Sequence, residues 1–384
     1  MDLPKKIILE LLNGKINPDT LANVKDEDWS YLVGLAKKKG IATVIFYNLK
    51  KANLLLSVPD LIRKDLENNY YCVLTQNTLA LRELAKILKA LDKLGIRSII
   101  LKGTALINSV YGDNPGLRPM IDIDILILPG QLDITEKCLE GLGYKISTRD
   151  FGSIIYSRNG DDSLTLSAKL LIEIHWQVLH NKFNRVLNID EIMFYRRAVN
   201  FKIEGLDCLG LSVEDNILYL SLHLTMIHFF ENIIWLYDIK RILEVYKESI
   251  SWDKLLKTAN ESGTKNMIYY CLSYCKDILG APIEGEIIQK FSPSKLKKKV
   301  ISRILKKDYI WQEEDLGKVS YLVQFLMFDT TGSLIKLLIS NIFPDKGLLR
   351  YRYPAKSYLK AYISYILRPF KIFLNLSRNG KTVS

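Results

Sequence analysis

The sequence predicts an α+β fold in which a mixed β-sheet lies between helical regions at either end of the chain. Two observations support this prediction. Apolar residues recur at helical spacing through residues 1–95, and again from Ser212 to about residue 343. Between these regions, short β-branched segments alternate with turns. We expect four parts: an N-terminal helical region (1–95), a sheet domain (96–205), a C-terminal helical domain (206–345) and a tail (346–384).

The first strand is expected directly after the N-terminal helices. The pattern "NTLALRELAKILKALDKLG" is helical, and Gly95 lies where a helix C-cap belongs. "IRSIIL" (96–101) is then a short strand, and "TALINSVY" is a helix that begins at the turn containing Gly103. "GDNPGLRP" is rich in turn formers, which predicts a loop.

The segment "IDIDILIL" (121–128) reads as a buried strand that carries two carboxylates. Side chains alternate between the two faces of a strand, so Asp122 and Asp124 lie on one face. A buried carboxylate without a partner costs several kcal/mol or more. The pattern therefore predicts a cationic partner near both aspartates.

Further elements complete the expected sheet domain. We expect a helix at about 132–142 and strands near 144–147 and 153–157. "KLLIEIHWQ" (169–177) is another strand, with Leu171, Glu173 and His175 on one face. Ser212 to Asp215 resembles a capping box, so the C-terminal helices should begin there.

Composition indicates sizeable cores and a basic tail. The 384 residues are 48% hydrophobic, which argues against wholesale disorder. The net charge is +12, yet residues 346–384 carry nine of the 54 Lys/Arg and none of the 42 Asp/Glu. The tail interleaves these cations with aromatic residues. It is either a final helix docked on the protein or a surface for an anionic partner, nucleic acid or membrane.

Cysteine usage and hydropathy predict a cytoplasmic location. The five cysteines are scattered without metal-ligand spacing, as expected for reduced thiols. The N-terminus lacks the pattern of a signal peptide. The longest charge-free apolar stretch, 216–230, is shorter than the ~20 residues of a spanning helix. We expect no transmembrane segment, and a protein that is cytoplasmic or peripheral to the membrane.

The carboxylates and the glycine turn together suggest a metal-dependent phosphate site. A strand, a glycine and a helix N-terminus present backbone N–H groups to phosphate oxygens. Asp122 and Asp124, with Glu173 from a neighbouring strand, could hold two Mg²⁺ ions ~4 Å apart. Each motif alone is weak, since Gly-Thr pairs are mostly turns and Asp-x-Asp occurs by chance. Their combination in this order favours a functional site.

These motifs resemble the DNA polymerase β-like nucleotidyltransferase superfamily. Within it, "LKGTAL", "YGDNPGLRPMIDIDILI", "IEIHW" and "WLYDIK" look like segments of the uncharacterised nucleotidyltransferase family. The resemblance is close over about 100–177 and weaker to about 260. Thr104 stands where the superfamily usually has Ser or Gly. The fold implied is a polymerase β-like nucleotidyltransferase core, with residues 96–205 as the catalytic domain.

The activity implied is transfer of a nucleoside monophosphate from an NTP to an acceptor hydroxyl, with release of pyrophosphate. The cofactor would be two Mg²⁺ ions, with Mn²⁺ as an alternative, and the NTP would be ATP by default. Asp122 and Asp124 would bridge both metals. Glu173 would bind the catalytic metal near the acceptor hydroxyl, as a candidate general base.

The nucleotide-binding residues implied surround these acids. The amides after Gly103, together with Thr104, would bind the β- and γ-phosphates, and Lys102 and Arg118 are the nearest cations. His175 either orients substrate or is a core histidine. Asp238 either contacts the base or ribose, or forms a helix-surface ion pair with Arg241 or Lys240.

Two other functions fit parts of the sequence. A glycosyltransferase could use Asp-x-Asp to bind a nucleotide-sugar, although its acidic pair normally follows a long α/β half. A non-catalytic nucleotide-binding module would not need three buried acids. The acceptor is left open: a small molecule, a sugar, a peptide, a protein side chain or an RNA end.

Overall fold

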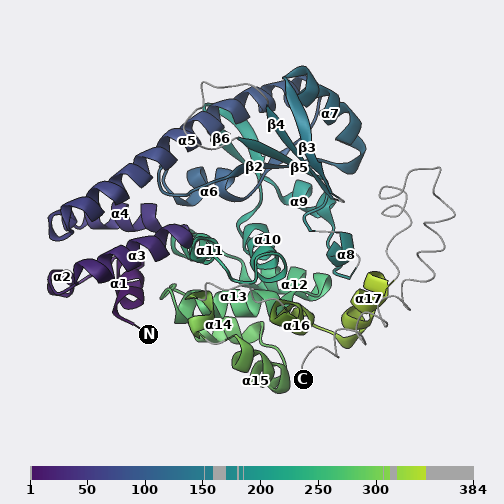
Figure 1. The fold of residues 1–384 in the computed structure, drawn as a ribbon. Helices are drawn as coiled ribbons and strands as arrows, with labels where there is room; N and C mark the ends of the chain where they lie inside the picture. Colours follow the sequence, from purple (N-terminus) through teal and green to yellow (C-terminus); the bar gives the residue numbers. More distant parts are fainter. Residues whose placement is uncertain are drawn as a thin grey trace, which may run out of the picture.

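The computed structural model describes residues 2–150, 152–158, 170–179, 181–184, 186–305, 307–311 and 318–342. It has the predicted α+β architecture: a mixed sheet at one end and helices around and below it (Figure 1). The basic tail (346–384) lies outside the described residues, so the alternatives for its role stay predictions.

The N-terminal part of the chain is helical, as predicted. Its helices are α1 (Leu3–Leu12), α2 (Pro18–Ala22), α3 (Asp26–Lys38), α4 (Ala42–Lys51) and α5 (Asp60–Lys93). Asp2 and Asn17 accept backbone N–H groups at the starts of α1 and α2, and a proline occupies the first turn of each. The last third of α5 packs against the sheet through an apolar face that includes Leu84 and Leu91. Within the described part of the chain, no helix has both the length and the apolar character needed to cross a membrane.

The sheet brings together strands that are far apart in the sequence. Among the described residues it has seven strands in the order β3-β4-β5-β2-β1-β7-β6. They are β1 (Ile99–Ile100), β2 (Asp122–Leu126), β3 (Tyr144–Arg149), β4 (Ser153–Arg158), β5 (Leu171–His175), β6 (Val199–Ile203) and β7 (Leu206–Gly210). β2 runs parallel to β5 and antiparallel to β1. The catalytic acids predicted on β2 and β5 therefore lie on adjacent strands.

The β6–β7 hairpin was not expected from the sequence. Its turn residues, Glu204 and Gly205, both have positive φ (49° and 77°), as a two-residue hairpin turn requires. β7 pairs in parallel with β1, so the sheet continues to Gly210. The domain boundary proposed at residue 205 thus falls inside this hairpin.

Short helices connect the strands, and a larger set follows them. The connections are α6 (Lys102–Val110), α7 (Leu132–Gly141), α8 (Asn181–Asn184) and α9 (Glu191–Arg197). The C-terminal helices are α10 (Val213–Met226), α11 (Ile233–Val245), α12 (Trp252–Ser262), α13 (Lys265–Asp277), α14 (Gly285–Lys290), α15 (Lys295–Ile304), α16 (Lys318–Met327) and α17 (Thr331–Ile342). The start predicted for α10 is as observed, because Ser212 Oγ accepts the Asp215 N–H at 3.2 Å.

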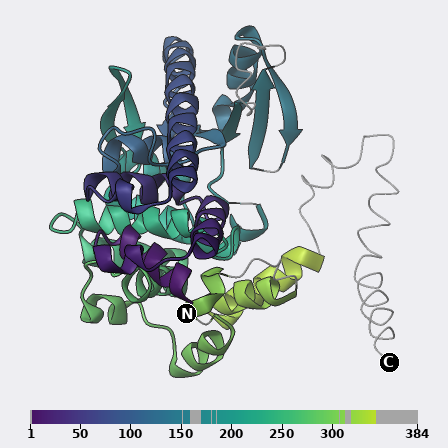
Figure 2. The same cartoon turned by 60° about the vertical axis from the view of Figure 1, so that its left-hand side comes forward.

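The protein has two apolar cores among the described residues, and they group the helices and strands differently from the four parts expected from the sequence. One lies between the sheet, α5, α6 and α7. The other is shared by α1, α3 and α4 with the C-terminal helices, which lie side by side in Figure 2. Lys240 on α11 joins the two helical regions, with its Nζ 3.0 Å from Leu12 O and 2.7 Å from Asn13 Oδ1. We infer a sheet unit and one helical body made from both ends of the sequence.

Candidate active site

The predicted acids meet at the centre of the sheet. Asp124 on β2 is the register partner of Glu173 on β5, because the two strands are parallel and aligned. Asp122 lies two residues before Asp124 on the same strand and therefore on the same face. Asp124 is only 2% exposed, whereas Asp122 and Glu173 are half-buried.

Two cations neutralise these carboxylates. Lys102 Nζ lies 2.6 Å from Asp124 Oδ1, and His175 Nε2 lies 2.8 Å from the same oxygen. His175 Nε2 is also 3.4 Å from Glu173 Oε2. We call Lys102, Asp122, Asp124, Glu173 and His175 the acid cluster. Lys102 and His175 are thus the cationic partners expected for the buried Asp124. They also act on the half-buried Asp122, where the repulsion from Asp124 outweighs them.

Part of the acid cluster has the donor set of a cation site. Within the described residues, one oxygen each of Asp124 and Glu173 and one nitrogen of His175 all lie within 4.8 Å of one another. Carboxylate oxygens suit Mg²⁺ and Mn²⁺. The residues present therefore fit a divalent cation. The trio differs from the predicted one, because His175 takes the place given to Asp122.

The charges of the acid cluster are strongly coupled. Asp124 and burial together raise the pKa of Asp122 to about 6. Burial alone would lower the pKa of His175, but Glu173 and Asp124 outweigh it and raise that pKa to about 9. Burial alone would raise the pKa of Glu173, yet His175 and Lys102 hold it well below its usual range. In the metal-free protein, His175 thus donates hydrogen bonds to the acids as an imidazolium.

The predicted phosphate turn lies beside the cluster, at the start of α6. Lys102 has a φ of 51°, an uncommon backbone conformation for a residue with a side chain. A Cβ at Gly103 would lie 2.8 Å from Met120 Cγ, so only glycine fits there without displacing Met120. Thr104 is 1% exposed, and its hydroxyl is 3.5 Å from Met120 Sδ. Met120 therefore covers this turn, and its flexible side chain would have to move before phosphate could bind.

Arg118 and Asp238 contact each other instead of lining an open surface. Arg118 donates to both carboxylate oxygens of Asp238 at 2.8–3.0 Å, and Tyr111 Oη donates to the same carboxylate at 2.6 Å. Asp238 is fully buried. The alternative of a surface ion pair between Asp238 and Arg241 or Lys240 is wrong. α11 turns Asp238 towards the sheet unit, where Arg118 neutralises it.

The loop that carries Arg118 is fixed from the other side by an N-terminal helix. Asn77 on α5 donates to Pro115 O at 2.6 Å and to Arg118 O at 2.8 Å. With both its backbone and its guanidinium engaged, Arg118 has the geometry of a residue that positions the loop before β2.

Two aromatic residues of the helical body, Tyr219 and His228, also lie within electrostatic reach of the acid cluster, a role that the sequence analysis did not assign to them. Tyr219 on α10 is fully buried, and its hydroxyl has no hydrogen-bond partner among the described residues. Lys102, Asp124 and Glu173 all act electrostatically on it. His228 stacks on Trp235 at 3.7 Å, and burial and Lys102 lower the pKa of His228 to about 3. The pattern available in the sequence is the pair His223 and His228, whose spacing of five residues is poor for one helical face and therefore predicts core or partly exposed histidines.

A comparison with protein families gives the family of the chain. The model of a family described as uncharacterised nucleotidyltransferases matches residues 25–280, two thirds of the chain. The chain belongs to this family. A comparison with curated proteins found no match. Membership in the uncharacterised nucleotidyltransferase family indicates a general nucleotidyl-transfer function and favours it over the glycosyltransferase alternative.

Proposed function

We propose that this protein transfers a nucleoside monophosphate from an NTP to an acceptor hydroxyl. In this reaction the acceptor oxygen bonds to the α-phosphorus, the bond from the α-phosphorus to the bridging oxygen breaks, and pyrophosphate leaves. The hydroxyl proton passes to a base. ATP is the NTP we expect by default, and the acceptor is a small molecule, a peptide or protein, or an RNA.

The observation that carries the proposal is the register between β2 and β5. It places Asp124 opposite Glu173, with Asp122 on the same face, and the contact of Lys102 with Asp124 puts these acids beside the start of α6. Three acids on one face, next to the start of a helix, whose first N–H groups have no partner within the helix, suit a substrate that brings both metal ions and phosphates.

Each side chain of the acid cluster would have a separate role. Asp122, Asp124 and Glu173 would hold two Mg²⁺ ions, or Mn²⁺, which when bound supply positive charge to the phosphates and to the acceptor oxygen. Glu173 accepts the proton of the acceptor hydroxyl. His175 donates to Asp124 and Glu173 and so fixes the orientation of both carboxylates.

The first turn of α6 would bind the triphosphate. The amides that follow Gly103 would donate to the phosphate oxygens, and Lys102 would add a positive charge at the same place. Lys102 contacts Asp124 in this structure, so it is already beside the position where the phosphates would lie. Arg118 and Asp238 support this arrangement from behind, as a buried pair.

Metal-dependent nucleotide binding tests the proposal without knowledge of the acceptor. Calorimetry of the full-length protein with α,β-methylene analogues of the four NTPs, which resist cleavage, should show binding that requires Mg²⁺. Asp124→Asn removes a metal-binding charge and should abolish that binding. Asp133→Asn changes an exposed carboxylate on α7 outside the cluster and is the matched control.

The outcomes separate clearly. Binding that persists unchanged in Asp124→Asn, or that is unaffected by chelation of Mg²⁺, would rule out the metal-dependent site. Once an acceptor is found, Asp122→Asn and Asp124→Asn should each abolish pyrophosphate release while the protein stays folded.

A further inference from the structure

Helix α17, the yellow helix in Figure 2, carries apolar side chains on two faces. Leu337 is 2% exposed and packs into the core of the helical body, and Leu334 packs beside it. Ile335, Leu338 and Ile339 follow one another at spacings of three and one, so they share another face of the helix. These three residues are 56%, 48% and 53% exposed, and we call them the apolar face of α17.

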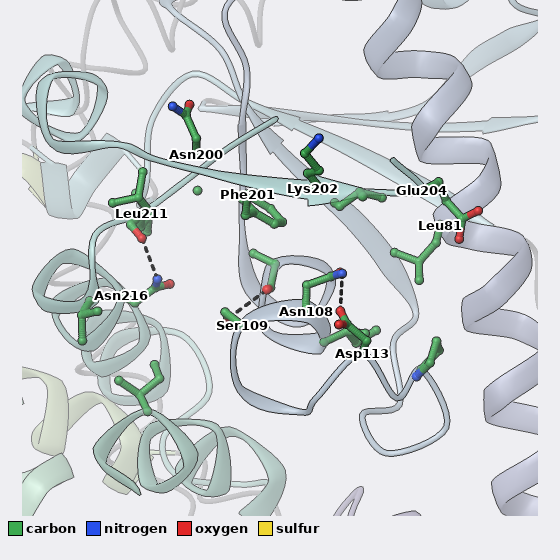
Figure 3. A pocket seen from close by; sticks show the side chains of 18 of the residues that line it. Leu81, Asn108, Ser109, Asp113, Asn200, Phe201, Lys202, Glu204, Leu211 and Asn216 are labelled. Carbon is green, nitrogen blue, oxygen red and sulfur yellow. Dashed lines mark hydrogen bonds between the residues drawn. The ribbon is translucent and has the colours of Figure 1, made fainter. Parts of the chain in front are cut away.

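The apolar face of α17 differs from the apolar surface inside the protein. The pocket between α6, the β6–β7 hairpin, α10 and α11, with a volume of about 900 Å³, is bounded by the protein's own elements (Figure 3). The apolar face of α17 is instead half-exposed along one helix. Contiguous exposed apolar residues of this kind mark interaction surfaces.

The turn before α17 is fixed by contacts with two other helices. Asp329 accepts the backbone N–H of Lys265 at the start of α13, at 2.9 Å. Lys297 on α15 donates to Asp329 O at 3.0 Å. Thr330 Oγ1 accepts the Ser333 N–H at 3.1 Å in the first turn of α17. The apolar face therefore belongs to an anchored helix, and α15 lies next to the start of that helix.

Helix α15 brings cations to the same part of the protein. Lys295, Lys299 and Arg303 are exposed and recur every four residues. Leu296 and Val300, which are also exposed, form an adjoining stripe. Residues 287–384 contain 19 of the 54 Lys/Arg and six of the 42 Asp/Glu, so the whole net charge of +12 arises in this part of the chain.

An anionic membrane suits this combination of apolar and cationic residues. Aliphatic side chains leave water at the boundary between headgroups and acyl chains, while Lys and Arg contact anionic headgroups. The 12 residues of α17 are fewer than the ~20 that cross a bilayer, and Leu337 holds one side of the helix in the core. This helix would therefore lie in the plane of the membrane surface.

Other occupants match the apolar face of α17 less well. A second copy of the chain would bring the same cationic region against itself. The chain's own tail (346–384) contains nine Lys/Arg and no Asp/Glu, so it would add like charge. Single-stranded nucleic acid binds through stacking on aromatic side chains, whereas the apolar face of α17 is aliphatic.

We propose that α17 and α15 form a docking surface for an anionic lipid bilayer. Ile335, Leu338 and Ile339 enter the boundary between headgroups and acyl chains. Lys336 and the exposed cations of α15 contact the headgroups. The inference does not depend on the proposed transfer reaction.

Vesicle flotation of the full-length protein tests the proposal. Vesicles made of equal parts of phosphatidylcholine and phosphatidylglycerol should bind the protein, and vesicles of phosphatidylcholine alone should bind it several-fold more weakly. Added salt should weaken the binding without abolishing it, because salt screens the cations but does not prevent the burial of aliphatic side chains.

A double variant, Ile335→Ser with Ile339→Ser, tests the apolar face. It should bind the anionic vesicles roughly tenfold more weakly or less, and should lose the binding that remains at high salt. The matched control is Leu56→Ser with Leu61→Ser, two exposed leucines at and just before the start of α5, and its vesicle binding should not change. Thermal melting shows that both variants are folded.

Four results would overturn the proposal. The first is that the full-length protein does not bind the anionic vesicles. The second is that the Ile335→Ser, Ile339→Ser variant binds them as well as the control, which would assign the binding to another segment. The third is that this variant is a monomer where the unmodified protein is a dimer, without vesicle binding by either, which would assign the face to a second copy. The fourth is that this variant loses binding to single-stranded RNA while no vesicle binding is found.

The two proposals fail separately. Metal-dependent nucleotide binding should be unchanged in the Ile335→Ser, Ile339→Ser variant. Asp124→Asn should lose that nucleotide binding and should still bind the anionic vesicles.

Discussion

Replacement of Arg118 by methionine should destabilise the protein strongly and should affect its nucleotide affinity less. Met is close to Arg in length but has no charge, so the substitution leaves Asp238 without its cation. That carboxylate is fully buried, and among the described residues the Tyr111 hydroxyl is the side-chain partner that it keeps. The perturbation therefore creates an uncompensated buried charge.

The magnitude follows from this burial. Removing one partner of a buried ion pair typically costs 3–5 kcal/mol. With an unfolding entropy of about 2 cal/mol/K per residue, that loss lowers the melting temperature of a chain of this length by roughly 4–6 °C. Adding Asp238→Asn removes the second charge and keeps an acceptor for Tyr111, so the double variant should recover about 2 kcal/mol or more.

Urea unfolding and thermal melting of both variants measure these changes, and Arg63→Met is the matched control. Arg63 pairs with Asp60 at 2.8 Å on the surface of α5, and its loss should cost under about 1 kcal/mol. If Arg118→Met were as stable as the control but bound NTP analogues weakly, Arg118 would be a phosphate ligand and the positioning role would be wrong.

Three further predictions concern the acid cluster and the tyrosine beside it. The pKa of Asp122 is raised from 3.8 to about 6, so its contribution to stability is present at acid pH and is lost as the pH rises through 6. At pH 8 with a chelator, the free energy of unfolding of Asp122→Asn, measured with urea, should therefore exceed that of the unmodified protein by about 3 kcal/mol. A gain that persisted at pH 4 would contradict this. Because Lys102 has a φ of 51°, Lys102→Gly should be about 1 kcal/mol more stable than Lys102→Ala, and equal melting temperatures would refute the strain. Tyr219→Phe removes a buried hydroxyl without a described partner, so it should stabilise the ligand-free protein by about 1 kcal/mol; a loss of stability would mean that the hydroxyl has a partner.

Local patterns in the sequence were enough for the main elements of the sheet. Alternation placed Asp122 and Asp124 on one face of β2, and the same rule placed Glu173 and His175 on one face of β5. A period of two residues is visible in a single segment. The hypothesis that Glu173 lies on a strand next to Asp122 and Asp124 came from the chemistry of a two-metal site, and the register of β2 and β5 places Glu173 opposite Asp124.

Contacts between distant segments could not be read in this way. Arg118 and Asp238 are 120 residues apart, and either residue alone looks like a surface charge in a polar or amphipathic segment. The β6–β7 hairpin was missed for a different reason, since its turn is Glu-Gly and lacks the Asn-Gly or Asp-Gly signal that identifies most such turns. In both cases the fold, and not local propensity, decides the conformation.

Helix α6 is held at both of its ends. At its start, Lys102 is bound to Asp124 on β2. At its end, Val110 O accepts from Arg241 on α11 at 3.0 and 3.2 Å, and the adjacent Tyr111 donates to Asp238 on the same helix. One short helix therefore spans from the acid cluster to the helical body. The predicted phosphate turn is the first turn of α6, so residues of α11 can fix its position from the other end of the helix. The buried Asp238 contributes to this through Tyr111 and through Arg118 in the loop before β2.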